Sequence, residues 1–343
     1  EDNAILYGDL PFCMLTIGIK VVIPDLSNFS PSALNSFYER FENFLGTMPE
    51  KYAMQIHSRT NSDYSNQLSA YKATKGLSKF DEFVRNHNYD RYNYASIEGE
   101  LWNKTLEIYL TESLTLKGNE KAIGKTLNTS KEGMKGFLSS LKSALTALGG
   151  RYEEMDNLDL ATAIKSVLNV STSAVTSEVE TQDEDIVDYY YNSDTVSVEN
   201  GTLYHAGRYH QFLSLRELPE ESFPYMCKIF TSNNHKDVSF TLTLRTKDKD
   251  DMLLHLETEY AKLTKDIEKE SSPSKEDNLN ELRQSILDLK KSSGGISSCT
   301  LISHLWSSEV ESLVSKVDTL KSNFSNLRGA RLYQTGLPVE SRR

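Results

Sequence analysis

Residues 118–126 come closest to a phosphate-binding loop, because two glycines and a Lys-Thr pair follow an expected strand. A phosphate loop has four residues between its glycines, so that the backbone amides close around a phosphate group. Here five residues separate Gly118 from Gly124. We therefore expect no nucleotide at this segment, and we assign neither ATP nor Mg²⁺ to this chain.

Histidine and acidic residues form no recognisable catalytic or metal-binding motif. His205 and His210 lie beside one expected strand, residues 204–215, and their odd spacing should point their side chains to opposite faces. The acidic runs 183–188 and 248–251 lack the spaced oxygens and turn glycine of a calcium loop. We interpret them as a linker and a helix start, and we predict no catalytic, cofactor-binding or metal-binding residue.

Three cysteines, Cys13, Cys227 and Cys299, are too far apart in the sequence for a disulfide framework or a zinc site. This usage suits a reducing cytoplasm, and we interpret all three as buried structural thiols.

The consecutive residues Tyr189, Tyr190 and Tyr191 beside the acidic run are the one candidate protein contact. Aromatic side chains with a hydroxyl group are enriched where proteins meet. A core strand or an edge strand explains the three tyrosines equally well.

The composition describes an acidic chain of 343 residues, with 38 Lys and Arg against 49 Asp and Glu. Its average surface should repel nucleic-acid backbones and anionic lipid, which disfavours a general nucleic-acid or membrane-surface role. The apolar run at residues 14–23 is interrupted by Thr16, Gly18 and Lys20, so we expect no transmembrane segment. The length is sufficient for two domains.

The first part of the chain alternates strands and helices. Ser30 and Pro31 are typical of a helix start, and apolar residues then recur at helical spacing up to Gly46. The predicted strands cover residues 13–23, 51–58 and 101–116, and the predicted helical segments cover 31–45, 64–87, 133–148 and 158–170. Composition then shifts to Ser, Thr, Asp and Glu, so we predict a lobe at 1–170 and an acidic linker at 171–200.

The remaining residues, 201–343, predict a second lobe. Residues 238–245 alternate apolar and polar side chains, as a half-buried strand does. Two helical segments at about 250–291 each carry one narrow apolar stripe, which favours an antiparallel helical hairpin. Further strands are predicted at 209–215, 299–306 and 330–335, with helices at 220–230 and 308–327.

The order of these elements indicates an α+β fold. In the second lobe it is that of a ferredoxin-like split βαβ unit with the helical hairpin inserted between its second and third strands. The first lobe begins in the same order, which is compatible with a divergent copy whose fourth strand the pattern does not reveal.

Several segments together resemble the N-terminal region of the large conjugative-transfer ATPase of bacterial type IV secretion systems. They are the run FLSLRELP at 212–219, the strand ending at Arg245, the charged helical insert, and the residues Gly336-Leu337-Pro338 after the last helix. The early strand ending in VVIPD at 21–25 is similar to the opening of that family.

The resemblance implies that this chain is the family's non-motor half. In that family the motor domain with its Walker motifs follows the Leu-Pro region, so its ATPase residues map to no position here. The implied partners are inner-membrane subunits of the secretion channel and neighbouring copies of the protein itself. The implied location is the cytoplasm, with peripheral association at the bacterial inner membrane.

Two other function classes remain open. One is an α+β enzyme with a site between the lobes and no local motif. The other is a single-stranded nucleic-acid binder that uses a ferredoxin-like sheet, for which stacking aromatics and a basic face are required. Aromatic residues are plentiful, but basic residues do not cluster.

Overall fold

The computed structural model describes residues 3–23, 29–62, 64–98, 100–147, 149–168, 197–199, 202–205, 207–217, 219, 236–269, 272–291, 296–327 and 329–334. The candidate contact Tyr189, Tyr190 and Tyr191, the acidic run 183–188, the predicted helix 220–230 and Cys227 lie outside the described residues.

All described strands belong to one 11-stranded sheet with the order β1-β2-β4-β3-β9-β10-β8-β7-β6, in which β5 also pairs with β2 and β11 with β8. Every pair is antiparallel. The prediction of a mixed α and β protein is therefore confirmed. The strands are β1 (Ile5–Tyr7), β2 (Phe12–Val22), β3 (Tyr52–Asn61), β4 (Asn103–Thr115), β5 (Arg151–Glu154), β6 (Ser197–Glu199), β7 (Thr202–His205), β8 (Arg208–Glu217), β9 (Val238–Lys247), β10 (Ile296–Ser307) and β11 (Arg331–Gln334).

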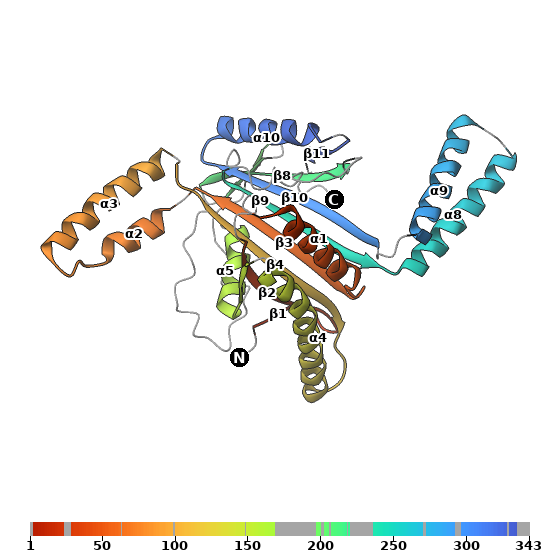
Figure 1. The fold of residues 1–343 in the computed structure, drawn as a ribbon, viewed down its shortest axis with the longest axis horizontal. Coiled ribbons are helices and arrows are strands. Elements are labelled where there is room, and N and C mark those ends of the chain that lie inside the picture. Colours follow the sequence, from red (N-terminus) through yellow and green to blue (C-terminus); the bar gives the residue numbers. More distant parts are fainter. Residues whose placement is uncertain are drawn as a thin grey trace.

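One face of the sheet is apolar and is covered by helices; we call it the helix-covered face. Alternate residues of β2 and β4 pack there against α1 (Pro31–Gly46) and α4 (Glu120–Ala147). Alternate residues of β9, β10 and β8 pack in the same way against α10 (Val310–Ser325). Figure 1 shows these three helices over the sheet. Burial of these apolar stripes is the main driving force for this layer.

The opposite face, which we call the polar face, carries Thr, Arg, His and Glu side chains from the same strands. Its one described helix is α5 (Asn157–Leu168), whose Leu160 and Ala163 pack with Ile5, Met155 and Tyr109. Tyr109 alternates along β4 with Ile108 and Leu110 of the helix-covered face. Alternation along the strands thus gives the two faces different chemistry.

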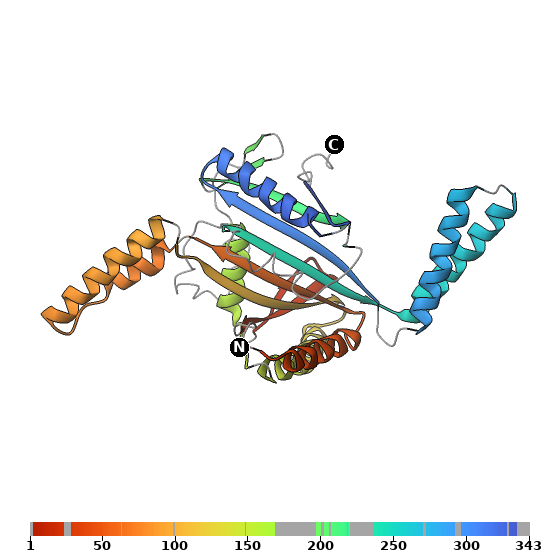
Figure 2. The same cartoon turned by 45° about the horizontal axis from the view of Figure 1, so that its top comes forward.

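Two helical hairpins project from opposite ends of the sheet as arms (Figures 1 and 2). The first arm, α2 (Ser65–Ala73) and α3 (Lys79–Ile97), follows β3, and the second, α8 (Lys249–Lys269) and α9 (Pro273–Lys291), follows β9. The helical hairpin predicted at about 250–291 is present. Its apolar stripes meet along the α8–α9 contact, and Ile286 and Leu289 are buried.

The two halves of the chain have the same strand order. In the first half the order is β3-β4-β2-β5, and in the second it is β9-β10-β8-β11. Strands β3 and β9 pair from Ala53 with Arg245 to Thr60 with Val238, so the halves share one sheet where we expected two lobes. Strand β5 occupies the position of the fourth strand that the sequence did not reveal. Its four residues are all exposed, so it carries no alternating pattern.

Two segments differ from the sequence prediction. The helix predicted from residue 133 in fact begins at Glu120. Its first turns carry only Ile123 and Leu127 as large apolar residues, which is too few for the sequence pattern to reveal a stripe. The strand predicted at 204–215 is in fact two strands, β7 and β8, which pair as a tight hairpin. Gly207 allows this turn, since it adopts a φ of 72° that most residues avoid.

Truncating one buried side chain of α10 should test how the core depends on this helix. Leu320 is fully buried, and Leu320→Ala should lower the free energy of unfolding by about 2–5 kcal/mol. Val314 on the same helix is 50% exposed, and Val314→Ala should change the free energy of unfolding by less than about 1 kcal/mol. Urea denaturation followed by circular dichroism measures both. Equal effects would contradict the assigned packing face.

Candidate docking surfaces

The β1–β2 hairpin exposes a group of large apolar side chains, which we call the hairpin surface. Tyr7 pairs directly with Met14, and Phe12 lies two residues earlier in β2, so the three share the polar face of the sheet. Leu10 in the connecting turn is 66% exposed and Phe12 is 71% exposed. Contiguous exposed apolar residues mark interaction sites.

The hairpin surface is held in place by the backbone. The amide of Phe12 donates to the carbonyl of Asp9 (2.8 Å), and the amide of Leu116 donates to the carbonyl of Pro11 (2.7 Å). The second bond fastens the turn to the segment that follows β4. The apolar side chains are therefore presented on a fixed backbone.

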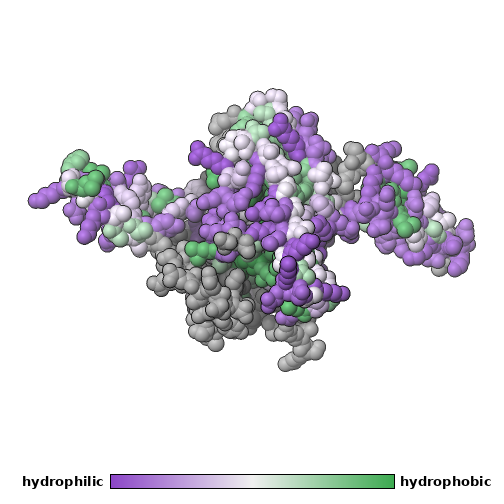
Figure 3. Space-filling model, turned by 90° about the horizontal axis from the view of Figure 1, so that it is seen from below, coloured by the Kyte–Doolittle hydropathy of each residue, from purple (hydrophilic) through white to green (hydrophobic). Residues whose placement is uncertain are grey.

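A second apolar group lies at the outer end of the α2–α3 arm; we call it the arm tip. It consists of Leu77, Phe80 and Phe83, where Leu77 is completely exposed, Phe80 is 77% exposed and Phe83 is 70% exposed. Figure 3 shows this apolar group at the end of the arm, next to strongly polar side chains.

Local contacts order the backbone of the arm tip. The Ser78 side chain accepts a hydrogen bond from the amide of Asp81, and the Asp81 carboxylate accepts one from the amide of Leu77 (2.8 Å). These reciprocal bonds form a capping arrangement at the start of α3. The backbone of α3 passes so close to Gly76 that a side chain would not fit there. A Cβ at this position would lie 2.8 Å from the amide nitrogen of Glu82. Arg85 also donates to the carbonyl of Tyr71 (2.9 Å), which ties α3 to α2.

A histidine cluster is buried on the polar face. The side chain of His210 contacts His304 (Nδ1 to Nε2, 3.0 Å), and its Nε2 lies 3.1 Å from the carbonyl oxygen of His205. Nδ1 of His57 lies 2.9 Å from the hydroxyl of Thr241. The prediction that His205 and His210 point to opposite faces is wrong, because the chain reverses between them. In the β7–β8 hairpin Leu203 opposes His210, and His205 lies two residues from Leu203, so both histidines share one face.

The hydrogen bonds fit a neutral form of the cluster. A carbonyl oxygen accepts only, so His210 donates from Nε2; neutral His210 then accepts at Nδ1 from the Nε2 proton of His304. Burial and, to a smaller extent, the positive charge of Arg59 lower the pKa of His57 to about 4. Burial also lowers the pKa of His210 and, well below its usual range, that of His304. The cluster thus contributes hydrogen bonds and ring stacking, with His304 stacked on Phe212 at 4.4 Å.

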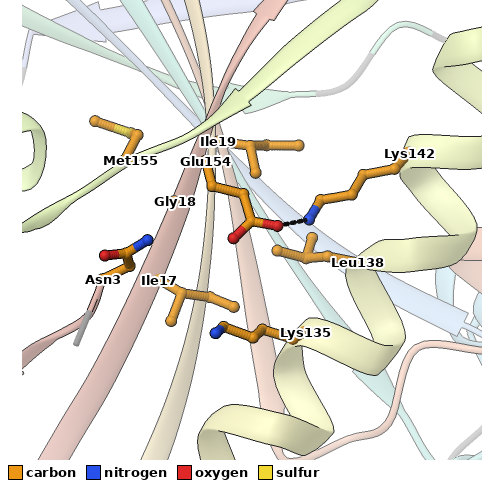
Figure 4. A pocket seen from close by; sticks show the side chains of 9 residues that line it. All are labelled: Asn3, Ile17, Gly18, Ile19, Lys135, Leu138, Lys142, Glu154 and Met155. Atoms are coloured by element: carbon orange, nitrogen blue, oxygen red, sulfur yellow. Dashed lines mark hydrogen bonds and ion pairs between the residues drawn. The ribbon is translucent and has the colours of Figure 1, made fainter. Parts of the chain in front are cut away.

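A small cavity lies between β2, β5 and α4 (Figure 4). Its volume is about 10 Å³, which is the space of one water molecule. Glu154 and Lys142 form an ion pair at its wall, and the hydrogen bond from Lys142 lowers the pKa of Glu154. This cavity is too small for a substrate. Its lining residues are Asn3, Ile17, Gly18, Ile19, Lys135, Leu138, Lys142, Glu154 and Met155.

The segment that resembles a phosphate loop is the start of α4. Gly124 and Lys125 lie inside this helix, where their amides belong to the helical hydrogen-bond pattern, and Asn119 accepts from the amide of Ala122 (3.1 Å). The acidic run 248–251 is a helix start, as predicted. Asp248 accepts hydrogen bonds from the amides of Asp250 (2.7 Å) and Asp251 (3.2 Å) at the beginning of α8.

The thiol prediction is correct for Cys13, which is buried, and wrong for Cys299, which is exposed. Cys299 lies near the beginning of β10, and the pairing of β10 with β8 starts only at Ile302. Among the described strands, β9 alone pairs with β10 at Cys299. Within the described ranges no group of three or more His, Cys, Asp and Glu side chains has a geometry that could hold a metal ion.

No protein-family model matches this chain, and a search among curated proteins finds no significant match. No described helix has both the length and the apolar composition that crossing a bilayer requires. The hairpin surface and the arm tip are the candidate contacts with other molecules, because their large apolar side chains are exposed. Sequence reasoning missed both, although Leu77, Phe80 and Phe83 stand out as large apolar residues in a polar segment.

The neutral histidines should make the fold sensitive to acid. The pKa of His57 is lower in the folded state, near 4, than the ordinary value of 6.5, so the unfolded state binds the proton more strongly. Stability should thus be constant above pH 6.5 and should fall between pH 6.5 and 4, with His57 alone accounting for about 2 kcal/mol at pH 5.

The matched variant is His57→Asn, whose amide group can replace the contact of Nδ1 with Thr241 without titrating. Thermal unfolding followed at pH 7 and pH 5 should show a smaller loss of stability on acidification in this variant than in the wild type. An identical loss in both proteins would contradict a neutral, buried His57.

Proposed function

We propose that this chain is a structural and protein-docking module of a type IV secretion ATPase. In this proposal it couples a motor domain outside the present sequence to inner-membrane subunits of the secretion channel. The observation that carries the docking role is the hairpin surface, whose apolar side chains are exposed on an ordered backbone. In this proposal ATP and Mg²⁺ belong to the motor domain.

The repeated strand order supports the architectural part of the proposal. We infer that each half is a ferredoxin-like split βαβ unit with a helical arm inserted between its second and third strands. The orders β3-β4-β2-β5 and β9-β10-β8-β11 are both compatible with this unit, and each arm follows the second strand of its half. A platform of two joined units offers rigid positions for partners and for neighbouring copies of the protein.

The backbone beside the hairpin surface favours an extended segment of the partner. Strand β1 ends the strand order, and in the described part of the chain it pairs with β2 alone. An outer strand presents backbone donors and acceptors to which another chain can add a strand. Alternate apolar side chains of that added strand would contact Tyr7 and Phe12. We therefore propose a cytoplasmic segment of an inner-membrane channel subunit as the occupant. In this proposal the protein acts in the cytoplasm at the inner membrane.

The double variant Tyr7→Ser/Phe12→Ser tests the docking role. It should weaken binding to the detergent-solubilised inner-membrane subunits of the same secretion system by roughly tenfold or more, because central aromatic residues dominate interface energies. Biolayer interferometry on the purified chain measures the dissociation constant.

The control variant is Leu254→Ser/Leu287→Ser, which removes two exposed apolar side chains from the α8–α9 arm. It should bind as the wild type does. Wild-type affinity of the Tyr7→Ser/Phe12→Ser protein, with an unchanged circular dichroism spectrum, would disprove the proposed surface.

A further inference from the structure

The arm tip combines protruding apolar side chains with an ordered backbone. Leu77, Phe80 and Phe83 are exposed at the outer end of an arm that projects away from the sheet (Figures 2 and 3). The capping bonds at Ser78 and Asp81 hold the backbone that carries them. A convex apolar end can enter a fluid apolar layer without needing a groove of matching shape.

The charge around the arm tip differs from that of the whole chain. Residues 72–80 contain Lys72, Lys75 and Lys79 and no acidic residue, whereas the whole chain has a net charge of −11. All three lysines are exposed. In the described part of the chain Lys75 and Lys79 form no ion pair, while the ammonium group of Lys72 lies over the Tyr89 ring at 5.0 Å.

The nearest acidic residues follow the tip in α3. Asp81 is engaged with the amide of Leu77, and Glu82 is exposed one residue further along the helix. Lys75 lies in the turn before α3 and Lys79 is the first residue of α3, so both are close in the chain to the exposed apolar residues. Basic residues next to inserted apolar side chains are the arrangement that attracts anionic lipid headgroups.

We propose that the arm tip binds the surface of an anionic membrane. Leu77, Phe80 and Phe83 enter the boundary between headgroups and acyl chains, and Lys75 and Lys79 contact lipid phosphates. Salt screens charges that are farther away than about 10 Å, so the net charge of the whole chain matters less at the tip than the lysines next to it. This lipid contact is independent of the proposed docking function, since it uses a different surface at the end of an arm.

Vesicle cosedimentation of the purified chain tests this proposal. The wild type should bind vesicles of phosphatidylcholine that contain about a third phosphatidylglycerol, and it should bind pure phosphatidylcholine vesicles roughly tenfold more weakly, since each nearby Lys adds a favourable contribution. The variant Leu77→Ser/Phe83→Ser should lose roughly tenfold or more in binding because it removes apolar burial. The variant Lys75→Glu/Lys79→Glu should lose a similar factor at low salt.

Matched variants separate this result from the docking proposal. Leu254→Ser/Leu287→Ser, on the other arm, and Tyr7→Ser/Phe12→Ser, on the hairpin surface, should both bind vesicles as the wild type does. If the Tyr7→Ser/Phe12→Ser protein loses partner binding and keeps vesicle binding, both proposals are supported. Loss of vesicle binding in the Tyr7→Ser/Phe12→Ser protein would overturn the assignment to the arm tip.

A probe at the tip reports insertion directly. In Phe80→Trp, emission of the introduced tryptophan should shift to shorter wavelength with the anionic vesicles and should be quenched by brominated lipid more strongly than that of the native Trp102 and Trp306. If the wild type leaves the anionic vesicles unbound, or if emission of the Phe80→Trp protein stays unchanged, the tip does not contact lipid and the proposal fails. These negative results are expected if the tip binds a protein partner and not lipid.

Discussion

The antiparallel pairing of β3 with β9 is the interaction on which the rest of the structure depends. It joins the outer strand of one half to the outer strand of the other from Ala53–Arg245 to Thr60–Val238. Backbone hydrogen bonds along this seam close two edges that would otherwise be exposed. Leu242 packs against the cores of both halves, so apolar burial is continuous across the seam.

The seam also decides where the arms point. Each arm follows the end of its seam strand, α2–α3 after β3 and α8–α9 after β9. Because the two strands run in opposite directions, the arms leave the sheet at opposite ends (Figure 1). The hairpin surface lies on a third part of the molecule, at the β1–β2 edge of the first half. One rigid sheet thus separates the proposed protein contact from the proposed lipid contact.

The polar face illustrates what the sheet requires of its buried side chains. Arg59 pairs across β3 and β9 with Ser239, Ser239 with His304 of β10, and His304 with Phe212 of β8. Burial disfavours additional charge here, so the pKa values of His57 and His304 are lowered, and His304 forms a hydrogen bond with His210. The side chain of Arg59 lies over the Trp306 ring at 5.3 Å. The result is a packed polar layer that depends on neutral histidine.

The sequence by itself determined the local elements. Alternation at 238–245 defines β9, the apolar stripes define the α8–α9 hairpin, and Ser30 with Pro31 defines the start of α1, because period and caps depend only on nearby residues. Only the tertiary structure decided which strands pair with each other. The exposed strand β5, the seam between β3 and β9, and the turn that brings His210 to the face of His205 all depend on partners distant in the chain or on one tight turn. Exposure of Phe12 and Phe80 was equally undecided, since an apolar residue is buried or exposed only through the other elements that cover it.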